Sequence, residues 1–230
     1  MRHQNPVDWE HYKILRERFG HVGSFAYWNS DTCKVPDCIR ADSEEEFLDK
    51  NLNEILHADI VFLGKNFGVN EDIQRVIDKN EPHAILEHYK NNCDLENQYG
   101  GKYAKKALYP TLKNTCLEGA YMTDLFKFPL EDSSYLAMGI PSKRLNDISE
   151  SITNKLIDHS INGLSFELRN IIGVKTDPIF VLFGQFPSGI EDKLLDKFPG
   201  ASVYKISHYA RKGYSKDQFK NEVNQLIKQI

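Results

Sequence analysis

The stretch ADIVFLGKNFG at residues 58–68 joins an apolar run to a short polar segment. Apolar side chains on both faces are typical of a central strand in a parallel sheet. The same arrangement recurs as GAYMTDLFK at 119–127, IFVLFGQ at 179–185 and VYKISHYAR at 203–211. The carboxyl ends of parallel strands meet at one edge of a sheet, where such folds bind ligands. We therefore expect Asn66, Asp124 and His208 to lie in one crevice.

Helices are predicted between these strands. An apolar helical pattern covers residues 8–19, and Ser43 with Glu46 is typical of a capping box that opens a helix to about residue 56. Further helices are expected over 142–157, 165–172, 190–198 and 216–230, with a short one over 71–80. Residues 81–118 have weak periodicity and are expected to form a loop beside the site. Strands separated by helices predict an α/β fold whose parallel sheet is covered on both faces.

Length and composition are those of one globular domain spanning residues 1–230. No apolar run is long enough to cross a bilayer, so no membrane partner is expected. Charged sequence follows the first residues where a secretory signal would be apolar, which favours a cytoplasmic protein. The four cysteines lack the spacing of a zinc or iron–sulfur site. We expect them to be reduced thiols, and we expect no metal and no cofactor.

The charge is distributed unevenly along the chain. The net charge is -4, which by itself argues mildly against a polyanionic partner. Residues 201–220 carry five basic side chains against one acidic side chain, and residues 101–113 carry four lysines and no acid. Either stretch could be an ordinary solvated surface. Because the first of them includes the proposed site residue His208, it also favours binding of a phosphate-bearing ligand.

Four motifs resemble those of the uracil-DNA glycosylase superfamily, nearest to a bacterial branch of it. GHVGSFAYW at 20–28 resembles an aromatic segment of the form Gly-His-x-x-Ser-x-Ala-x-Trp. GKNFG at 64–68 is similar to the Gly-Ile-Asn-Pro-Gly motif of the mismatch-specific glycosylases. GAYMTD at 119–124 is similar to a strand of the branch and is the most specific match. SHY at 207–209 resembles the second catalytic motif, which is usually His-Pro-Ser or Asn-Pro-Ser.

The resemblance covers nearly the whole chain and implies a three-layer αβα sandwich with four parallel strands in the order 2-1-3-4. It implies hydrolysis of the N-glycosidic bond of a damaged or mismatched base flipped out of DNA. Asn66 matches the position that orients the attacking water, and His208 is placed to donate to the base oxygen as negative charge develops. Gly64, Phe67 and Asp124 would contact the flipped base, with Phe67 stacking on it.

DNA is the partner that this resemblance implies. Lys65, Arg211 and Lys212 stand where they could contact its phosphates. Hydrolysis of this kind needs neither a cofactor nor a metal, and we expect a monomer.

Other functions stay open at this point. A carboxylate only accepts hydrogen bonds, so Asp124 cannot donate to a uracil carbonyl. Phe67 and Tyr209 also replace the prolines of the two motifs. One alternative is a catalytically inactive module that binds nucleic acid or a nucleotide on the same fold. Another is an enzyme acting on a free nucleotide, with Lys65 and Lys127 at the phosphates.

Each site residue also has a purely structural interpretation. Asn66 fits a turn, Phe67 the core, Asp124 a cap and His208 a histidine packed among tyrosines. The aromatic segment at 20–28 has the composition of packing residues, and its rings are expected to be mostly buried.

Overall fold

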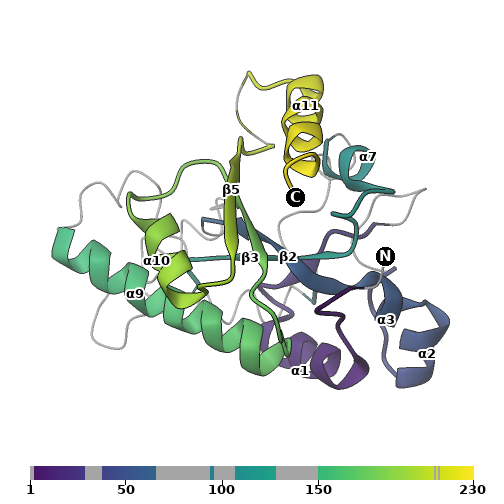
Figure 1. Ribbon diagram of the computed structural model, residues 1–230. Coiled ribbons are helices and arrows are strands. Elements are labelled where there is room, and N and C mark those ends of the chain that lie inside the picture. Colours follow the sequence, from purple (N-terminus) through teal and green to yellow (C-terminus); the bar gives the residue numbers. More distant parts are fainter. Residues whose placement is uncertain are drawn as a thin grey trace, which may run out of the picture.

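The computed structural model describes residues 3–28, 38–65, 94–95, 107–127, 150–209, 211 and 213–230 (Figure 1). Within these ranges, five strands form one mixed sheet in the order β1-β3-β2-β4-β5. The strands are β1 (Ser24–Phe25), β2 (His57–Gly64), β3 (Ala120–Asp124), β4 (Ile179–Phe183) and β5 (Ser202–Ile206). The predicted α/β class is confirmed.

The sheet was predicted to have four strands, all parallel, and this prediction is wrong because a fifth, antiparallel strand is present. β1 pairs with β3 in antiparallel register, with Ser24 opposite Met122 and Phe25 opposite Tyr121. β2 pairs in parallel with both β3 and β4, and β4 pairs in parallel with β5. Numbered alone, these four strands lie in the order 2-1-3-4. A strand of two residues is too short to show the alternation by which strands are predicted.

The described helices lie where the strands leave apolar faces to cover. They are α1 (Trp9–Phe19), α2 (Glu44–Asp49), α3 (Leu52–Ile55), α7 (Tyr109–Leu112), α9 (Glu150–Phe166), the π-helix η2 (Glu167–Ile171), α10 (Ile190–Lys197) and α11 (Lys216–Ile227). The helix predicted up to residue 56 is divided into α2 and α3 because Asn51 adopts a left-handed conformation, with φ of 54°. The separate helix predicted over 165–172 is instead a continuation, since α9 passes directly into η2.

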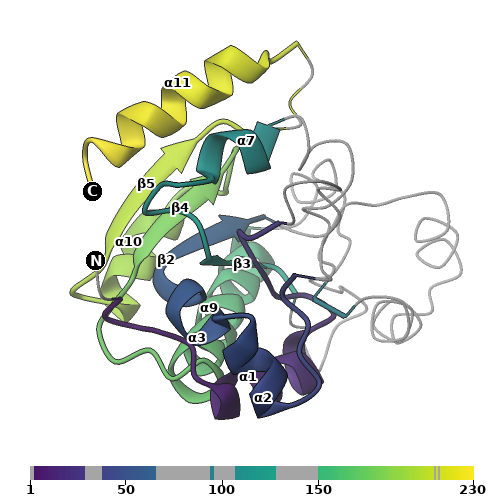
Figure 2. The same ribbon diagram turned by 90° about the vertical axis from the view of Figure 1, so that its right-hand side faces the viewer.

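Helices cover both faces of the sheet, which gives three layers (Figures 1 and 2). On one face, Leu156 of α9 and Leu194 of α10 belong to the core cluster that contains Leu182 of β4. On the other face, Phe219 of α11 belongs to the cluster that contains Phe183 of β4. Neighbouring residues of β4 thus point into different cores, as the two-residue period of a strand requires. This layering leaves the carboxyl ends of the strands as the place for a site.

The aromatic segment packs as predicted. Phe25 is fully buried and Trp28 is 4% exposed, while Tyr27 is partly buried against the core. Cys116 is a free thiol, and the thiol of Cys38 donates to the carbonyl of Tyr27 at 3.6 Å. Cys33 and Cys93 lie outside the described residues.

Two further predictions concern the segment after β2 and the membrane. The helix predicted over 71–80 lies outside the described residues. Among the helices of the described ranges, none combines the length and apolar character that crossing a bilayer requires.

The first residues of the chain are fastened to the sheet by Asn5. Its backbone nitrogen donates to Oδ1 of Asp59 at 2.6 Å, and its carbonyl accepts from the nitrogen of Ala58 at 2.9 Å. Its side-chain amide donates to the carbonyl of Thr176 at 3.0 Å and accepts from the nitrogen of Lys175 at 2.9 Å. One buried asparagine therefore joins the beginning of β2 to the loop that leads into β4.

Candidate functional site

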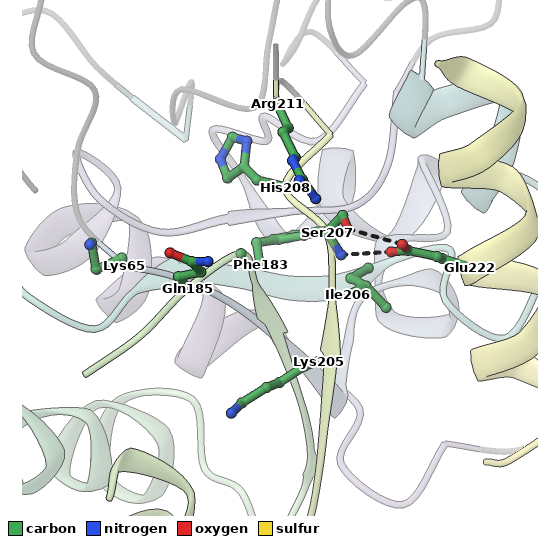
Figure 3. Close-up of a pocket in the computed structure, with 10 residues that line it drawn as sticks. Lys65, Phe183, Gln185, Lys205, Ile206, Ser207, His208, Arg211 and Glu222 are labelled. Carbon is green, nitrogen blue, oxygen red and sulfur yellow. Dashed lines mark hydrogen bonds between the residues drawn. The ribbon is translucent and has the colours of Figure 1, made fainter. Parts of the chain in front are cut away.

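A pocket of about 790 Å³ opens at the carboxyl ends of β4 and β5 (Figure 3). Such a volume is typical of sites for small organic ligands. Its floor is apolar and its walls are polar and mostly basic; the lining residues are Lys65, Phe183, Gly184, Gln185, Lys205, Ile206, Ser207, His208, Arg211 and Glu222. These residues come from the ends of three strands and from α11, so the fold itself assembles the pocket.

His208 stands on the pocket wall, half-buried among aromatic rings. Its imidazole stacks on the ring of Tyr209, with centroids 4.4 Å apart, and meets Phe183 edge-on at 6.2 Å. Gly184 allows this approach, because a Cβ at that position would lie 3.3 Å from Cβ of His208. Burial lowers the pKa of His208 below its usual value, so the ring is neutral at pH 7. A neutral imidazole still offers one N–H donor and one acceptor.

Basic side chains flank this histidine. Lys65 is half-buried, its pKa is lowered by burial, and no acidic side chain of the described residues pairs with it. Arg211 is exposed and follows a turn in which its backbone nitrogen donates to the carbonyl of His208 at 2.9 Å. Lys205 lines the same pocket but forms an ion pair with Glu191, and Figure 3 shows it pointing away from His208. The pocket therefore presents Lys65 and Arg211 as its available cations.

One acidic residue completes the wall. Oε2 and Oε1 of Glu222 on α11 accept hydrogen bonds from the backbone nitrogen and the hydroxyl of Ser207, at 2.6 and 2.9 Å (Figure 3). Burial acts to raise the pKa of Glu222, but hydrogen bonds from Ser207 and Tyr214 and the charge of Arg211 outweigh it, and the pKa is lowered. Glu222 is thus ionised at pH 7 and fixes the chain that carries His208.

A second cluster of polar side chains lies at the end of β3, but it is buried and does not open to the pocket. Glu167 of η2 is fully buried, accepts from the hydroxyl of Tyr121 at 2.5 Å and pairs with Nζ of Lys127 at 2.6 Å. Nζ of Lys127 also donates to the carbonyl of Asp124 at 2.7 Å. Asp124 itself is 2% exposed and does not line the pocket. Its carboxylate is therefore screened from a ligand in that pocket.

The predicted site residues thus divide into three sets. Lys65, His208 and Arg211 line one pocket. Gly64 and Asp124 lie opposite each other at the ends of β2 and β3, at the same edge of the sheet but outside the lining. The remaining three, Asn66, Phe67 and Lys212, lie outside the described residues.

Sequence reasoning did not assign roles to Gln185, Ser207 and Glu222. Gln185 follows a strand end, and that position alone was a usable signal. Glu222 lies in the middle of a helix with nothing in its local sequence to mark it. Only the packing of α11 beside β5 brings it to the pocket.

Comparisons with protein-family models, with curated proteins and with solved structures give no match.

Proposed function

We propose that the pocket binds a base extruded from DNA and that the protein hydrolyses its N-glycosidic bond, as the superfamily it resembles does. The observation that carries the proposal is His208, held neutral on the wall of a pocket that also presents Lys65 and Arg211. A phosphate-bearing ligand with a planar base needs cations for the phosphates and a donor or acceptor for the base edge. This pocket supplies both.

The chemistry requires few groups. As the bond between C1′ and the base breaks, its electron pair passes to the base and a water oxygen bonds to C1′. The proton that this water loses ends on the released base. His208 donates its N–H to the base oxygen where negative charge develops, which stabilises the transition state. The water is oriented by Asn66 in the proposal, on the strength of its motif position at the end of β2.

The base edge is assigned to a different residue from the one predicted. Asp124 is buried beside Lys127, so the proposal replaces it by Gln185, which is exposed in the pocket. The amide of Gln185 forms no hydrogen bond with the described residues, and it offers both a donor and an acceptor. This removes the objection that a carboxylate cannot donate to a base carbonyl.

The test is single-turnover release of base from oligonucleotides that contain uracil, hypoxanthine, xanthine or mismatched thymine. We expect release from at least one of them. His208→Ala should slow that release by about two to three decades and leave DNA affinity within a few-fold. Asn66→Ala should also remove most of the turnover, because its amide orients the attacking water in the proposal. The exposed Arg18 on α1 provides a control, since Arg18→Ala should change neither rate nor affinity.

One outcome of this test would favour the alternative function. Wild-type protein that binds DNA but releases no base from any of the substrates would favour a binding module without catalysis. The buried position of Asp124 supports this alternative of a binding module without catalysis.

A further inference from the structure

Three potential metal ligands gather at the opposite end of β2 from the pocket. Nδ1 of His3 lies 2.9 Å from Oδ2 of Asp59, and Nδ1 of His57 lies 4.0 Å from the same oxygen. The two imidazole rings are stacked, with centroids 3.9 Å apart and planes 9° apart. The donor atoms of the three side chains lie within 4.8 Å of one another. The residues come from the first segment of the chain and from β2, which cross here.

The buried member of the set has an unsatisfied nitrogen. His57 is 0% exposed, and its Nε2 lies 3.1 Å from the carbonyl oxygen of Glu118. A carbonyl only accepts, so Nε2 carries the hydrogen and Nδ1 of the neutral ring carries a lone pair. That Nδ1 has no hydrogen-bond partner and faces the carboxylate of Asp59. Two acceptors that face each other in a buried place leave a position that a cation would satisfy.

The carboxylate is held in place by the backbone. Oδ1 of Asp59 accepts from the nitrogen of Asn5 at 2.6 Å, while Oδ2 accepts from the nitrogen of Gln4 at 3.2 Å. Oδ2 also lies 2.9 Å from Nδ1 of His3, and a bound metal ion would take the lone pair that Oδ2 offers to that ring. The hydrogen bond from His57 to Glu118 resembles the outer-shell contact by which proteins orient an imidazole ligand.

We propose that His3, His57 and Asp59 bind a divalent transition-metal ion, with Zn²⁺ the best fit, and that water completes the coordination. Tetrahedral zinc with bonds of about 2.1 Å needs neighbouring ligand atoms about 3.4 Å apart. The two distances from Oδ2 of Asp59, 2.9 and 4.0 Å, bracket that value. To reach that spacing, the contact between His3 and Asp59 lengthens and the contact between His57 and Asp59 shortens. The ring hydrogen of His3 moves to Nε2 when its Nδ1 binds the ion.

The site has no cysteine, which is why the cysteine spacing could not predict it. Its ligands lie at the amino-terminal end of β2, away from the pocket residues, so the proposal is independent of base release. The expected effect of the ion is structural, because it would fasten residues 3–5 to the sheet.

The test is titration of the full chain with Co²⁺, after removal of bound metal with a chelator, followed by displacement with Zn²⁺. We expect one equivalent of Co²⁺ with the visible absorption bands of a tetrahedral N,O site, and loss of those bands when Zn²⁺ is added. His3→Ala should weaken Co²⁺ binding by at least about tenfold, because the loss of a ligand exceeds the loss of an outer-shell partner. Zn²⁺ should raise the unfolding temperature of the wild type but not of His3→Ala.

A matched control is present on α1. Nδ1 of His11 lies 2.7 Å from Oδ1 of Asp8, a histidine–aspartate pair without a second histidine beside it among the described residues. His11→Ala should leave Co²⁺ affinity unchanged. Asp59→Asn keeps the size of the side chain and the oxygen facing Asn5, so it tests the charge of the site in a folded protein. Wild-type protein without Co²⁺ bands, or His3→Ala with wild-type affinity, would overturn the assignment.

Discussion

The carboxyl ends of β3 and β5 lie at the same edge of the sheet, but their polar side chains have opposite surroundings. At the end of β3, Lys127 and Glu167 are both buried and satisfy each other. At the end of β5, His208 and Arg211 line an open pocket. Position at a strand end therefore identifies candidates, while the available partners decide which candidates can meet a ligand.

The buried polar side chains at the end of β3 bind one another, as expected of a cluster with a structural role. Oε1 of Glu167 accepts from Tyr121 at 2.5 Å and from Thr123 at 3.1 Å. Burial lowers the pKa of Lys127, and the charge of Glu167 acts against that effect. Burial and Glu167 together raise the pKa of Tyr121 well above its usual value, so the phenol stays a donor. Every member of this group depends on the charge of Glu167.

The largest expected effect is therefore at the closed end. Glu167→Gln leaves the ammonium of Lys127 buried without a counter-charge, which should lower the free energy of unfolding by about 3–5 kcal/mol. Urea denaturation measures this. The exposed pair Lys13 and Glu10, 2.9 Å apart, is the control, because Glu10→Gln should leave stability nearly unchanged. If Glu167→Gln protein were as stable as the wild type, the buried ion pair at the end of β3 would have no structural role that distinguishes it from the polar side chains at the end of β5.

The next effect is at the open end. Arg211→Ala should weaken DNA binding by about tenfold, since a hydrogen bond to a charged group is worth roughly 1.5–3 kcal/mol before screening. The slope of log affinity against log salt should fall by about one. Lys65→Ala should act in the same way, whereas Lys155→Ala, on the exposed side of α9, should not. Fluorescence anisotropy at several salt concentrations checks both numbers, and unchanged slopes would mean that DNA does not lie across this pocket.

A smaller effect concerns pH. A protonated His208 adds a positive charge to the pocket, so DNA affinity should rise as the pH falls. Because burial lowers its pKa, the rise should begin only below the ordinary imidazole value of about 6.5. Binding measured from pH 8 to pH 5 should show an increase of a few-fold that His208→Gln lacks. An increase of equal size in His208→Gln would assign the effect to another group.

The smallest expected effect is a substitution that increases DNA affinity, whereas Arg211→Ala and Lys65→Ala lower it. Glu222 is ionised on the pocket wall because Ser207, Tyr214 and Arg211 together hold its pKa low. Glu222→Gln keeps an oxygen for Ser207 and removes a negative charge near the phosphates, so DNA affinity should increase by about twofold. A titration at low salt, with Glu17→Gln on α1 as the control, would resolve it. Weaker binding by Glu222→Gln would show that its anchoring of Ser207 matters more than its charge.

Much of this arrangement was predictable, and the physical reason is local. A strand was expected at the start of the stretch 203–211, and β5 ends at Ile206, where that apolar run meets polar residues. His208 could be placed at the pocket for the same reason, since it follows that strand. The hydrogen bond from Thr123 to Glu167 joins residues 44 apart. It depends on a π-helix, whose wider turn the helical periodicity of the sequence does not indicate. Closure of the β3 end is therefore a property of the tertiary structure.

The contacts of Asn5 bear on the order in which the chain folds. They join residues 171 positions apart, and β2 lies between two strands, β3 and β4, that are both synthesised after it. Long-range pairing of this kind must close large loops before any contact compensates the lost chain entropy, which makes folding slow. On the ribosome, one edge of β2 waits unpaired until β3 emerges and the other until β4 emerges, and its apolar faces are not fully covered before then. The central strand that organises the finished sheet is thus also the segment of the nascent chain most in need of protection.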